Sequence, residues 1–222
     1  EEIDGGSGTD RIIATSGDDT LDFSTGPTLT SIEKIDGGAG DDSIIGTAGD
    51  DNIYGNSGDD TLIGGVGDDT FSIYSSSNGH DQIDGGDGYD KIEGSSSSDI
   101  LYVESGLSNL TGIEEIDGGS GTDRIIATSG DDTLDFSKGP TLTSIEKIEG
   151  RDGDDLIIGG AGNDVIDGGG DNDTLIGGAG DDTLYGGYGN DSLEGGDDAD
   201  TFSVQNSFGT DTVIGGEGGD DY

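Results

Sequence analysis

The chain has 222 residues, of which 51 are acidic and only seven are basic, so its formal net charge is −44. Only 27% of the residues are hydrophobic, which argues against a globular domain that folds on an apolar core alone. The charge disfavours nucleic acid and anionic membrane surfaces as partners. The chain has no cysteine, and no apolar stretch approaches the ~20 residues that cross a bilayer, so we expect neither disulfides nor membrane insertion by this segment.

Glycine contributes 48 residues, and each one adds backbone entropy that folding must overcome, roughly 0.5–1 kcal/mol more than an alanine. A ligand from outside the chain is therefore expected to stabilise the fold. Multivalent cations fit best, because carboxylates are hard oxygen ligands and each divalent ion removes two units of self-repulsion.

A nine-residue repeat of the form G-G-x-G-x-D-x-U-x, where U is apolar, runs along the chain. In chain order, the repeats are most regular in two blocks, 37–72 and 150–203. Five short insertions interrupt the rest of the pattern, at 23–27, 73–75, 103–108, 136–140 and 204–205. The repeat therefore accounts for nearly the whole chain.

Three repeats carry glutamate instead of aspartate at the sixth place, namely Glu33, Glu114 and Glu146, and each follows an insertion. Their eighth places keep isoleucine. We therefore expect these repeats to retain the strand, to change the turn and to interrupt any ladder of bound ions.

The first six places of each repeat predict a turn, and the last three predict a short strand. Glycines supply the positive φ angles that a tight turn around an ion needs. Side chains alternate along a strand, so the eighth-place residue points inward. Two repeats then complete one coil of a parallel β-solenoid, about 18 residues long, with a thin core. The predicted core residues are Ile12, Leu21, Ile44, Ile53, Leu62, Phe71, Ile83, Ile92, Leu101, Ile125, Leu134, Ile157, Ile166, Leu175, Leu184, Leu193, Phe202 and Val213.

Sixth-place aspartates of successive coils should meet across the stack, where unneutralised carboxylates would repel. A Ca²⁺ ion between two such aspartates and several turn carbonyls would find the six to eight oxygens that it prefers, at roughly 2.4 Å, whereas Mg²⁺ requires a stricter octahedron. The predicted metal ligands are Asp10, Asp19, Asp42, Asp51, Asp60, Asp69, Asp81, Asp90, Asp123, Asp132, Asp155, Asp164, Asp173, Asp182, Asp191, Asp200, Asp211 and Asp220.

These repeats resemble those of the repeats-in-toxin (RTX) family, whose nonapeptide has the pattern given above. The resemblance implies an all-β, right-handed parallel β-roll with multiple Ca²⁺ ions in its turns, and export from a bacterium by type I secretion. Departures from the pattern are the glutamate repeats, the serine-rich repeat at 94–102, and the fourth-place Asp171 and Asp198.

A longer duplication lies over the nonapeptides, because residues 1–36 recur at 114–149 with only two differences. It predicts two β-roll units, 1–113 and 114–222. The sequence starts and stops inside the repeat pattern, so we expect it to be a piece of a longer protein.

Other interpretations of single residues are weaker. Paired carboxylates also serve glycosidases, but nearly every turn has a pair, so we expect no catalytic residue. His80 is the only histidine, and we expect an exposed turn residue. The outward tyrosines could stack on sugar rings, although scattered surface tyrosines are ordinary. The fifth-place acids could be outer ligands but are expected to be mainly solvated: Asp18, Asp41, Asp50, Asp59, Asp68, Asp131, Asp154 and Asp181.

The sequence thus favours a secreted, calcium-responsive folding and spacer module that is not itself an enzyme. One alternative is an accessory module of an extracellular polymer-acting enzyme, such as a protease, lipase or alginate epimerase, with a polysaccharide partner. Another is part of a repetitive adhesin or surface-layer protein with a cell-surface partner. Unpaired strand edges at the ends of the solenoid could also support end-to-end association.

Overall fold

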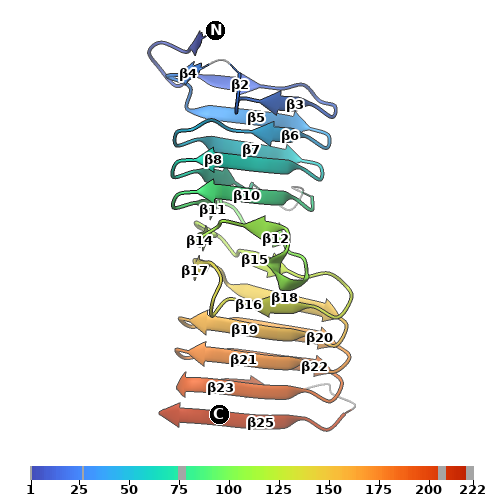
Figure 1. The fold of residues 1–222 in the computed structure, drawn as a ribbon. Coiled ribbons are helices and arrows are strands. Elements are labelled where there is room, and N and C mark those ends of the chain that lie inside the picture. Colours follow the sequence, from blue (N-terminus) through green and yellow to red (C-terminus); the bar gives the residue numbers. More distant parts are fainter. Residues whose placement is uncertain (1, 27, 75–78, 205–208, 219–222) are drawn as a thin grey trace. The chain divides into compact units, whose positions relative to one another are not determined.

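The computed structural model describes residues 2–26, 28–74, 79–204 and 209–218 (Figure 1). These residues form strands β1 to β25 and one short 3-10 helix, η1 (Ser105–Leu107). The strand pairings are parallel, which confirms the predicted all-β parallel β-roll. In the part of the chain that is described, no helix is long and apolar enough to cross a membrane.

The chain divides into two compact units, and the first comprises residues 1–101 and 109–123. Two stacks of parallel strands form its walls, with a small additional pair, β1 (Glu2–Asp4) and β4 (Thr28–Thr30). One wall runs in the order β13 (Leu110–Thr111), β10 (Gln82–Asp87), β8 (Thr61–Val66), β6 (Ser43–Ile45) and β3 (Thr20–Asp22). The other contains β14 (Glu115–Asp117), β11 (Lys91–Glu93), β9 (Thr70–Ser72), β7 (Asn52–Ser57), β5 (Lys34–Ala39) and β2 (Arg11–Ile13).

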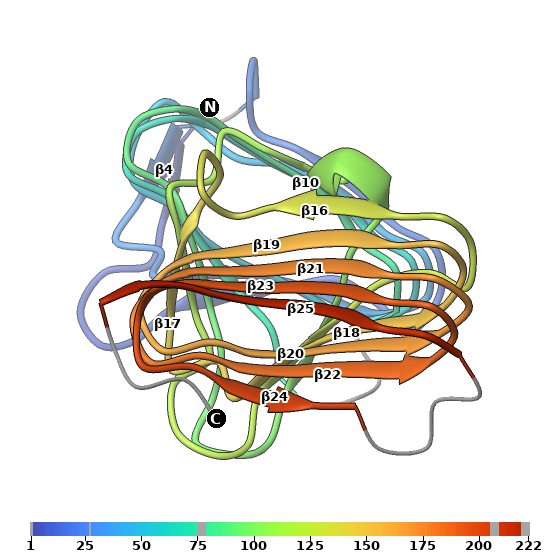
Figure 2. The same ribbon diagram turned by 90° about the horizontal axis from the view of Figure 1, so that it is seen from below.

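The second unit comprises residues 102–108 and 124–222. Figure 2 shows its two walls facing each other, with turns at both ends of the coils. One wall has the order β15 (Arg124–Ile126), β18 (Lys147–Asp152), β20 (Val165–Gly170), β22 (Thr183–Tyr188) and β24 (Thr201–Ser203). The other has β16 (Thr133–Asp135), β19 (Leu156–Ala161), β21 (Thr174–Ala179), β23 (Ser192–Asp198) and β25 (Thr212–Gly218). The remaining strands are β12 (Ile100–Tyr102) and β17 (Thr141–Thr143).

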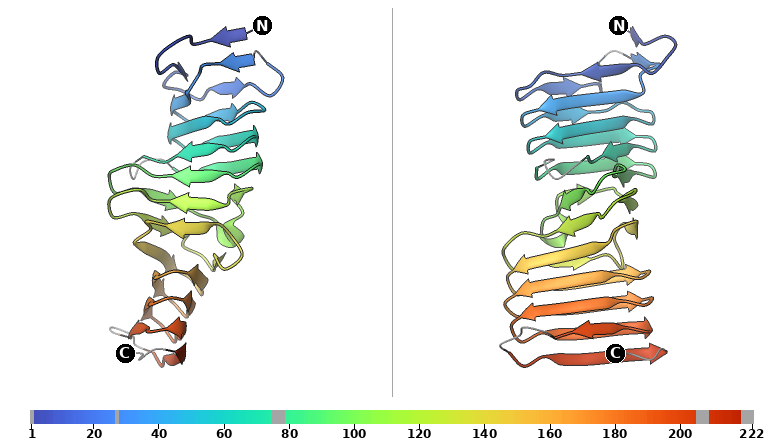
Figure 3. Two further views of the ribbon diagram at one scale, coloured as in Figure 1. Left: turned by 90° about the vertical axis from the view of Figure 1, so that its left-hand side faces the viewer. Right: turned by 180° about the vertical axis from the view of Figure 1, so that it is seen from behind.

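The strand register places eighth-place residues on one another. Ile53 of β7 pairs with Phe71 of β9, and Leu175 of β21 pairs with Leu193 of β23. These partners are two nonapeptides apart in the sequence, so one coil contains two repeats, as predicted. The regular stacking of successive coils within each unit can be followed in Figure 3.

Most eighth-place side chains are buried and form the predicted thin core. Phe71, Ile157 and Leu184 are 0% exposed. Burial is incomplete toward the ends of the walls, where β25 is the last strand of its sheet and Val213 is 45% exposed. The core therefore depends on coverage of each layer by the coils on either side.

The insertion at 103–108 belongs to the second unit, although residues 109–123 return to the first. Its η1 covers β16, the edge strand of its sheet. Ser105 Oγ accepts a 3.0 Å hydrogen bond from the Thr133 N–H, and Leu107 is buried against Gly139. In the same region Phe136 is only 5% exposed. The unit boundary between residues 113 and 114, which the sequence duplication predicts, remains a prediction. The two compact units instead exchange segments, because 102–108 belongs to the second unit and 109–123 to the first.

Candidate metal-binding turns

The sixth-place aspartates lie inside the turns, and most of them are buried. Asp60 and Asp173 are each only 1% exposed. A buried carboxylate is costly unless hydrogen bonds or cations compensate for the lost hydration. The predicted ligand Asp220 lies outside the described residues.

Hydrogen bonds join these aspartates into columns along the stack. The N–H of Asp42 donates to Oδ1 of Asp60 in the next coil at 2.8 Å, and the N–H of Asp60 donates to Oδ1 of Asp81 at 3.0 Å. The described columns are Asp19–Asp42–Asp60–Asp81, Asp51–Asp69–Asp90, Asp99–Asp123, Asp132–Asp155–Asp173–Asp191–Asp211 and Asp164–Asp182–Asp200. The structure thus brings together the residues that the sequence predicted would meet.

Two of the glutamate repeats take part in the same pattern. The N–H of Asp10 donates to Oε2 of Glu33 at 2.7 Å, and the N–H of Asp90 donates to Oε2 of Glu114 at 2.8 Å. The strands that follow, β5 and β14, are present as predicted. The backbone of these turns does change, because Ser31 and Gly112 adopt φ angles of 54° and 60°. Each glutamate accepts from the preceding coil, but its own N–H donates back to a backbone carbonyl oxygen of that coil, Asp10 O at 3.0 Å or Asp90 O at 2.9 Å. The hydrogen-bonded carboxylate column therefore ends at these glutamates.

One group of turns, which we call open turns, leaves the second carboxylate oxygen bare. Their second-place residue has a positive φ angle, as in Gly65 (120°) and Gly178 (121°), and this residue is Asn56 or Arg151 in two cases. The Oδ2 atom is then buried without a hydrogen-bond partner in Asp10, Asp42, Asp60, Asp69, Asp90, Asp155, Asp164, Asp173, Asp182 and Asp191.

In several open turns, a backbone carbonyl oxygen of the next coil lies close to the bare carboxylate oxygen. A Cβ atom at Gly177 would collide with Oδ2 of Asp182 and would lie 2.7 Å from the carbonyl oxygen of Gly195 in the next coil. A Cβ at Gly178 would collide with the carbonyl oxygen of Gly160. Only glycine permits this approach. Carboxylate and carbonyl oxygens are the ligands that Ca²⁺ prefers, so the open turns fit this ion.

Burial and mutual repulsion also act on the carboxyl groups. The pKa of Asp173 is raised to about 8, mainly by burial and also by the neighbouring Asp155 and Asp191 carboxylates. Burial likewise raises the pKa of Asp81 and Asp164 to about 7, and of Asp60, Asp69, Asp155 and Asp182 to about 6. Without a cation, the ionised open turns are electrostatically unfavourable at neutral pH.

A second group, which we call closed turns, satisfies the same oxygen internally. Thr47 donates to Oδ2 of Asp51 from its N–H at 2.6 Å and from its hydroxyl at 3.0 Å. Thr15 and Asp19 make the same pair of bonds, at 2.7 and 2.6 Å, and the hydroxyl and N–H of Thr15 lower the pKa of Asp19. The other closed turns pair Thr128 with Asp132 and Ser95 with Asp99.

Asp99 is a member of the columns that was absent from the predicted ligands. It is 1% exposed, and its N–H donates to Oδ1 of Asp123 at 2.7 Å. Serines replace the turn glycines in this repeat, so its turn was not recognised as a metal-binding one. Aspartate at the sixth place and Leu101 at the eighth were the signals that could have identified it.

The fifth-place side chains form an outer column that the sequence did not predict. The N–H of Asp59 donates to Oδ1 of Asp41 at 2.9 Å, and the N–H of His80 donates to Oδ1 of Asp59 at 2.8 Å. Asn172 and Asn190 continue the pattern in the second unit. Here each side chain accepts from the following coil, whereas each sixth-place aspartate accepts from the preceding one. The fifth-place residues, including His80, are exposed as expected, but they also join coils.

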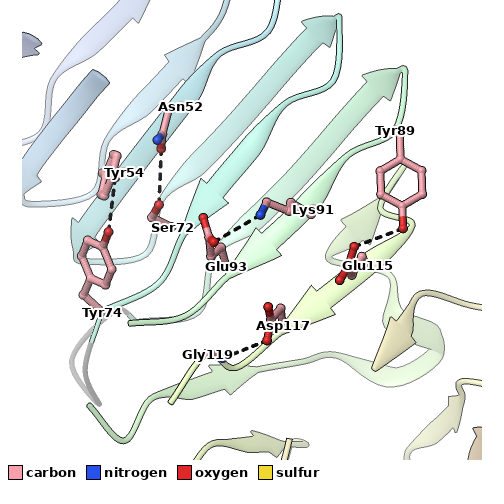
Figure 4. A network of polar contacts seen from close by, with 10 residues as sticks. All are labelled: Asn52, Tyr54, Ser72, Tyr74, Tyr89, Lys91, Glu93, Glu115, Asp117 and Gly119. Carbon is pink, nitrogen blue, oxygen red and sulfur yellow. Dashed lines mark hydrogen bonds and ion pairs between the residues drawn. The ribbon is translucent and has the colours of Figure 1, made fainter. Parts of the chain in front are cut away.

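The outer face of β7, β9, β11 and β14 carries a separate polar network (Figure 4). The Tyr74 hydroxyl donates to the Tyr54 hydroxyl at 3.2 Å, and their ring centroids are 5.3 Å apart. Lys34 Nζ lies 3.3 Å from the centroid of the Tyr54 ring. Tyr54 is therefore covered and only 9% exposed, so its ring is not available for stacking on a sugar.

Within the described ranges, no three acidic or histidine side chains gather in a group that could hold a metal ion. Comparison with protein families gives a match to the RTX calcium-binding nonapeptide repeat (4 copies), over residues 2–26, 36–71, 75–107, 110–140, 143–175 and 167–202. Comparison with curated proteins gives no match.

Proposed function

Since this chain belongs to the family of RTX calcium-binding nonapeptide repeats, we propose that it is a structural module whose β-roll is completed by calcium ions in its open turns. The observation that carries the proposal is the set of buried Oδ2 atoms without hydrogen bonds, several of them close to a backbone carbonyl oxygen of the next coil. The open-turn aspartates would supply carboxylate oxygens, and Asp81 and Asp211 would extend the same columns.

Calcium would act as the switch for folding. With a net charge of −44 and a core one apolar residue thick per half-coil, the metal-free chain is expected to be expanded at neutral pH. RTX repeats are typical of secreted bacterial proteins, and extracellular fluid supplies roughly millimolar calcium. We propose that the chain stays extended during export and folds outside the cell.

A calcium titration of metal-stripped protein at pH 7.5 tests this function. Circular dichroism should report a gain of β-structure, and small-angle X-ray scattering should report compaction, both cooperatively because neighbouring coils stabilise each other. Magnesium should be much less effective, because it prefers a strict octahedron. A metal-stripped chain that is already compact and fully β-structured would contradict the proposal.

Polysaccharide binding is a second candidate, as an accessory module of a polymer-acting enzyme or as part of an adhesin. The supporting observation is the set of tyrosines that remain exposed on the surface: Tyr74, Tyr89, Tyr185 and Tyr188. Affinity electrophoresis of the calcium-loaded chain in gels with neutral and acidic polysaccharides would test it. Retardation that is lost on substitution of these tyrosines by alanine would support it, and unchanged mobility in every gel would exclude it for the polymers used.

A further inference from the structure

The two kinds of turn differ in backbone conformation at the second and fourth places: the fourth-place φ angle is positive in the open turns, as in Gly67 (133°), but not in the closed turns, as in Gly49. In the open turns the second-place residue has a positive φ angle, for example Gly38 (104°) and Gly65 (120°). In the closed turns that place is Thr15, Thr47, Ser95 or Thr128, none of which has a positive φ angle. The N–H of the second-place residue consequently points to Oδ2 of the aspartate four residues later.

In the closed turns, hydrogen bonds from the chain itself therefore compensate the charge on Oδ2, which a cation would compensate in the open turns. Oδ2 of Asp51 receives two donors from Thr47, whereas Oδ2 of Asp69, in the next coil of the same column, is buried and receives none. Both oxygens lie near the first-place glycine of their own turn. The two turns are thus alike at the first place. They differ in the donors at the second place and in the backbone at the fourth, where Gly67 has a positive φ angle and Gly49 does not.

We propose that the closed turns at Asp19, Asp51, Asp99 and Asp132 are locked by their own threonine or serine and hold no calcium. This inference rests on the proposed function, because it divides the predicted calcium sites into those that bind and those that do not. The N–H donor, joined by the hydroxyl of Thr15, Thr47 and Thr128 in their turns, takes the place of the positive charge of the ion. These donors also occupy the oxygen through which the aspartate would bind it.

The position of two closed turns in the fold supports a role as metal-free starting layers. Asp19 directly precedes β3, and Asp132 directly precedes β16, and these strands form the edges of their sheets. Each aspartate then donates its N–H to the open-turn aspartate of the next coil, Asp42 or Asp155. At the edge of a sheet, only one coil is present to hold an ion. A turn whose carboxylate is satisfied by its own hydrogen bonds can begin the column there without one.

The test compares two consecutive members of one column, Asp51→Asn and Asp69→Asn. The asparagine carbonyl can still accept hydrogen bonds, so each substitution removes mainly the charge. Bound calcium is counted by equilibrium dialysis and mass spectrometry at saturating calcium, with circular dichroism as the folding control. We expect the wild-type count for Asp51→Asn and the loss of at least one ion for Asp69→Asn. Equal losses would overturn the inference.

A gain-of-binding variant keeps the test decisive if Asp69→Asn does not fold. Thr47→Gly converts the turn into Gly-Gly-Ala-Gly-Asp-Asp, the open pattern, and should add one calcium ion per chain. Thr47→Ser retains both donors and should keep the wild-type count. An unchanged count in Thr47→Gly would contradict the inference. A wild-type chain that binds no calcium would instead reject the proposed function as a whole.

Discussion

The N–H of Asp155 donates a 3.0 Å hydrogen bond to Oδ1 of Asp173 in the following coil, while Oδ2 of Asp173 has no hydrogen-bond partner. One oxygen of the carboxylate thus joins the coils, and the other is left for a ligand. Charge and geometry conflict at such positions until a cation binds.

Acid should partly replace calcium. Burial raises the folded-state pKa of Asp173 to about 8, of Asp164 to about 7 and of Asp60 to about 6. A raised folded-state pKa makes the protonated form favour folding at low pH, and this contribution is lost as pH rises through about 6–8. Metal-stripped protein should therefore gain β-structure as pH falls from about 8 to 5, measured by circular dichroism. A constant spectrum over this range would contradict the prediction.

The same carboxyl groups should make calcium binding weaken in acid. Protons and calcium compete for the same oxygens, so the midpoint of the calcium titration should shift to higher concentration as pH falls from about 8 to 6. Titrations at fixed ionic strength would measure this shift, since screening by salt also changes with buffer composition. A midpoint that does not depend on pH would show that the raised-pKa aspartates are not calcium ligands.

Gly177→Ala should destabilise the calcium-loaded roll. Its Cβ would collide with Oδ2 of Asp182 and approach the carbonyl oxygen of Gly195, and overpacking of this kind costs about 1–3 kcal/mol. Urea unfolding at saturating calcium measures the change. Gly170→Ala is the matched control, because its Cβ would have no neighbour closer than Asp152 Oδ1 at 3.3 Å. Equal destabilisation by both substitutions would contradict the explanation.

The free energy of unfolding should fall when a fifth-place side chain of the outer column loses its hydrogen-bond acceptor, but not when it loses only its charge. Asp59→Ala removes the acceptor of the His80 N–H and should lower the free energy of unfolding by about 0.5–1 kcal/mol. Asp59→Asn should be nearly neutral, because Asn172 and Asn190 already serve as acceptors at equivalent places. Neither variant should change the number of bound calcium ions. A loss of ions in either one would assign the fifth-place side chains to the metal sites.

The segment 103–108, which packs over β16, should stabilise the second unit. Leu107→Ala removes a side chain that is 8% exposed, and such truncations cost about 2–5 kcal/mol. Ser105→Ala removes the acceptor of the Thr133 N–H and should cost less, about 1 kcal/mol. Ser108→Ala, an exposed position on the same segment, serves as the control. Urea unfolding of all three variants would show whether the segment contributes as its contacts indicate.

The nonapeptide period determined most of the fold, because an apolar residue at every eighth place predicts strand, direction and core together. Ile44 and Leu175 are buried and paired as the period predicted. The period did not predict how carboxylate oxygens are shared. Whether Oδ2 of an aspartate is bare or bonded follows the backbone conformation at the second and fourth places of its turn. Arg151 adopts a positive φ angle that its residue type does not favour, whereas Asn56 belongs to a residue type that tolerates one.

The interleaving of the two units has a consequence for transplanting this fold into other proteins. A fragment cut at the sequence duplication, after residue 113, would leave residues 102–108 behind and would expose the edge of β16 that they cover. Without that cover, an unpaired strand edge becomes a template for aggregation. A portable version of the second unit should therefore keep residues 102–108, begin before β12 (Ile100–Tyr102) so that this strand is not cut, and replace 109–123 with a short polar linker.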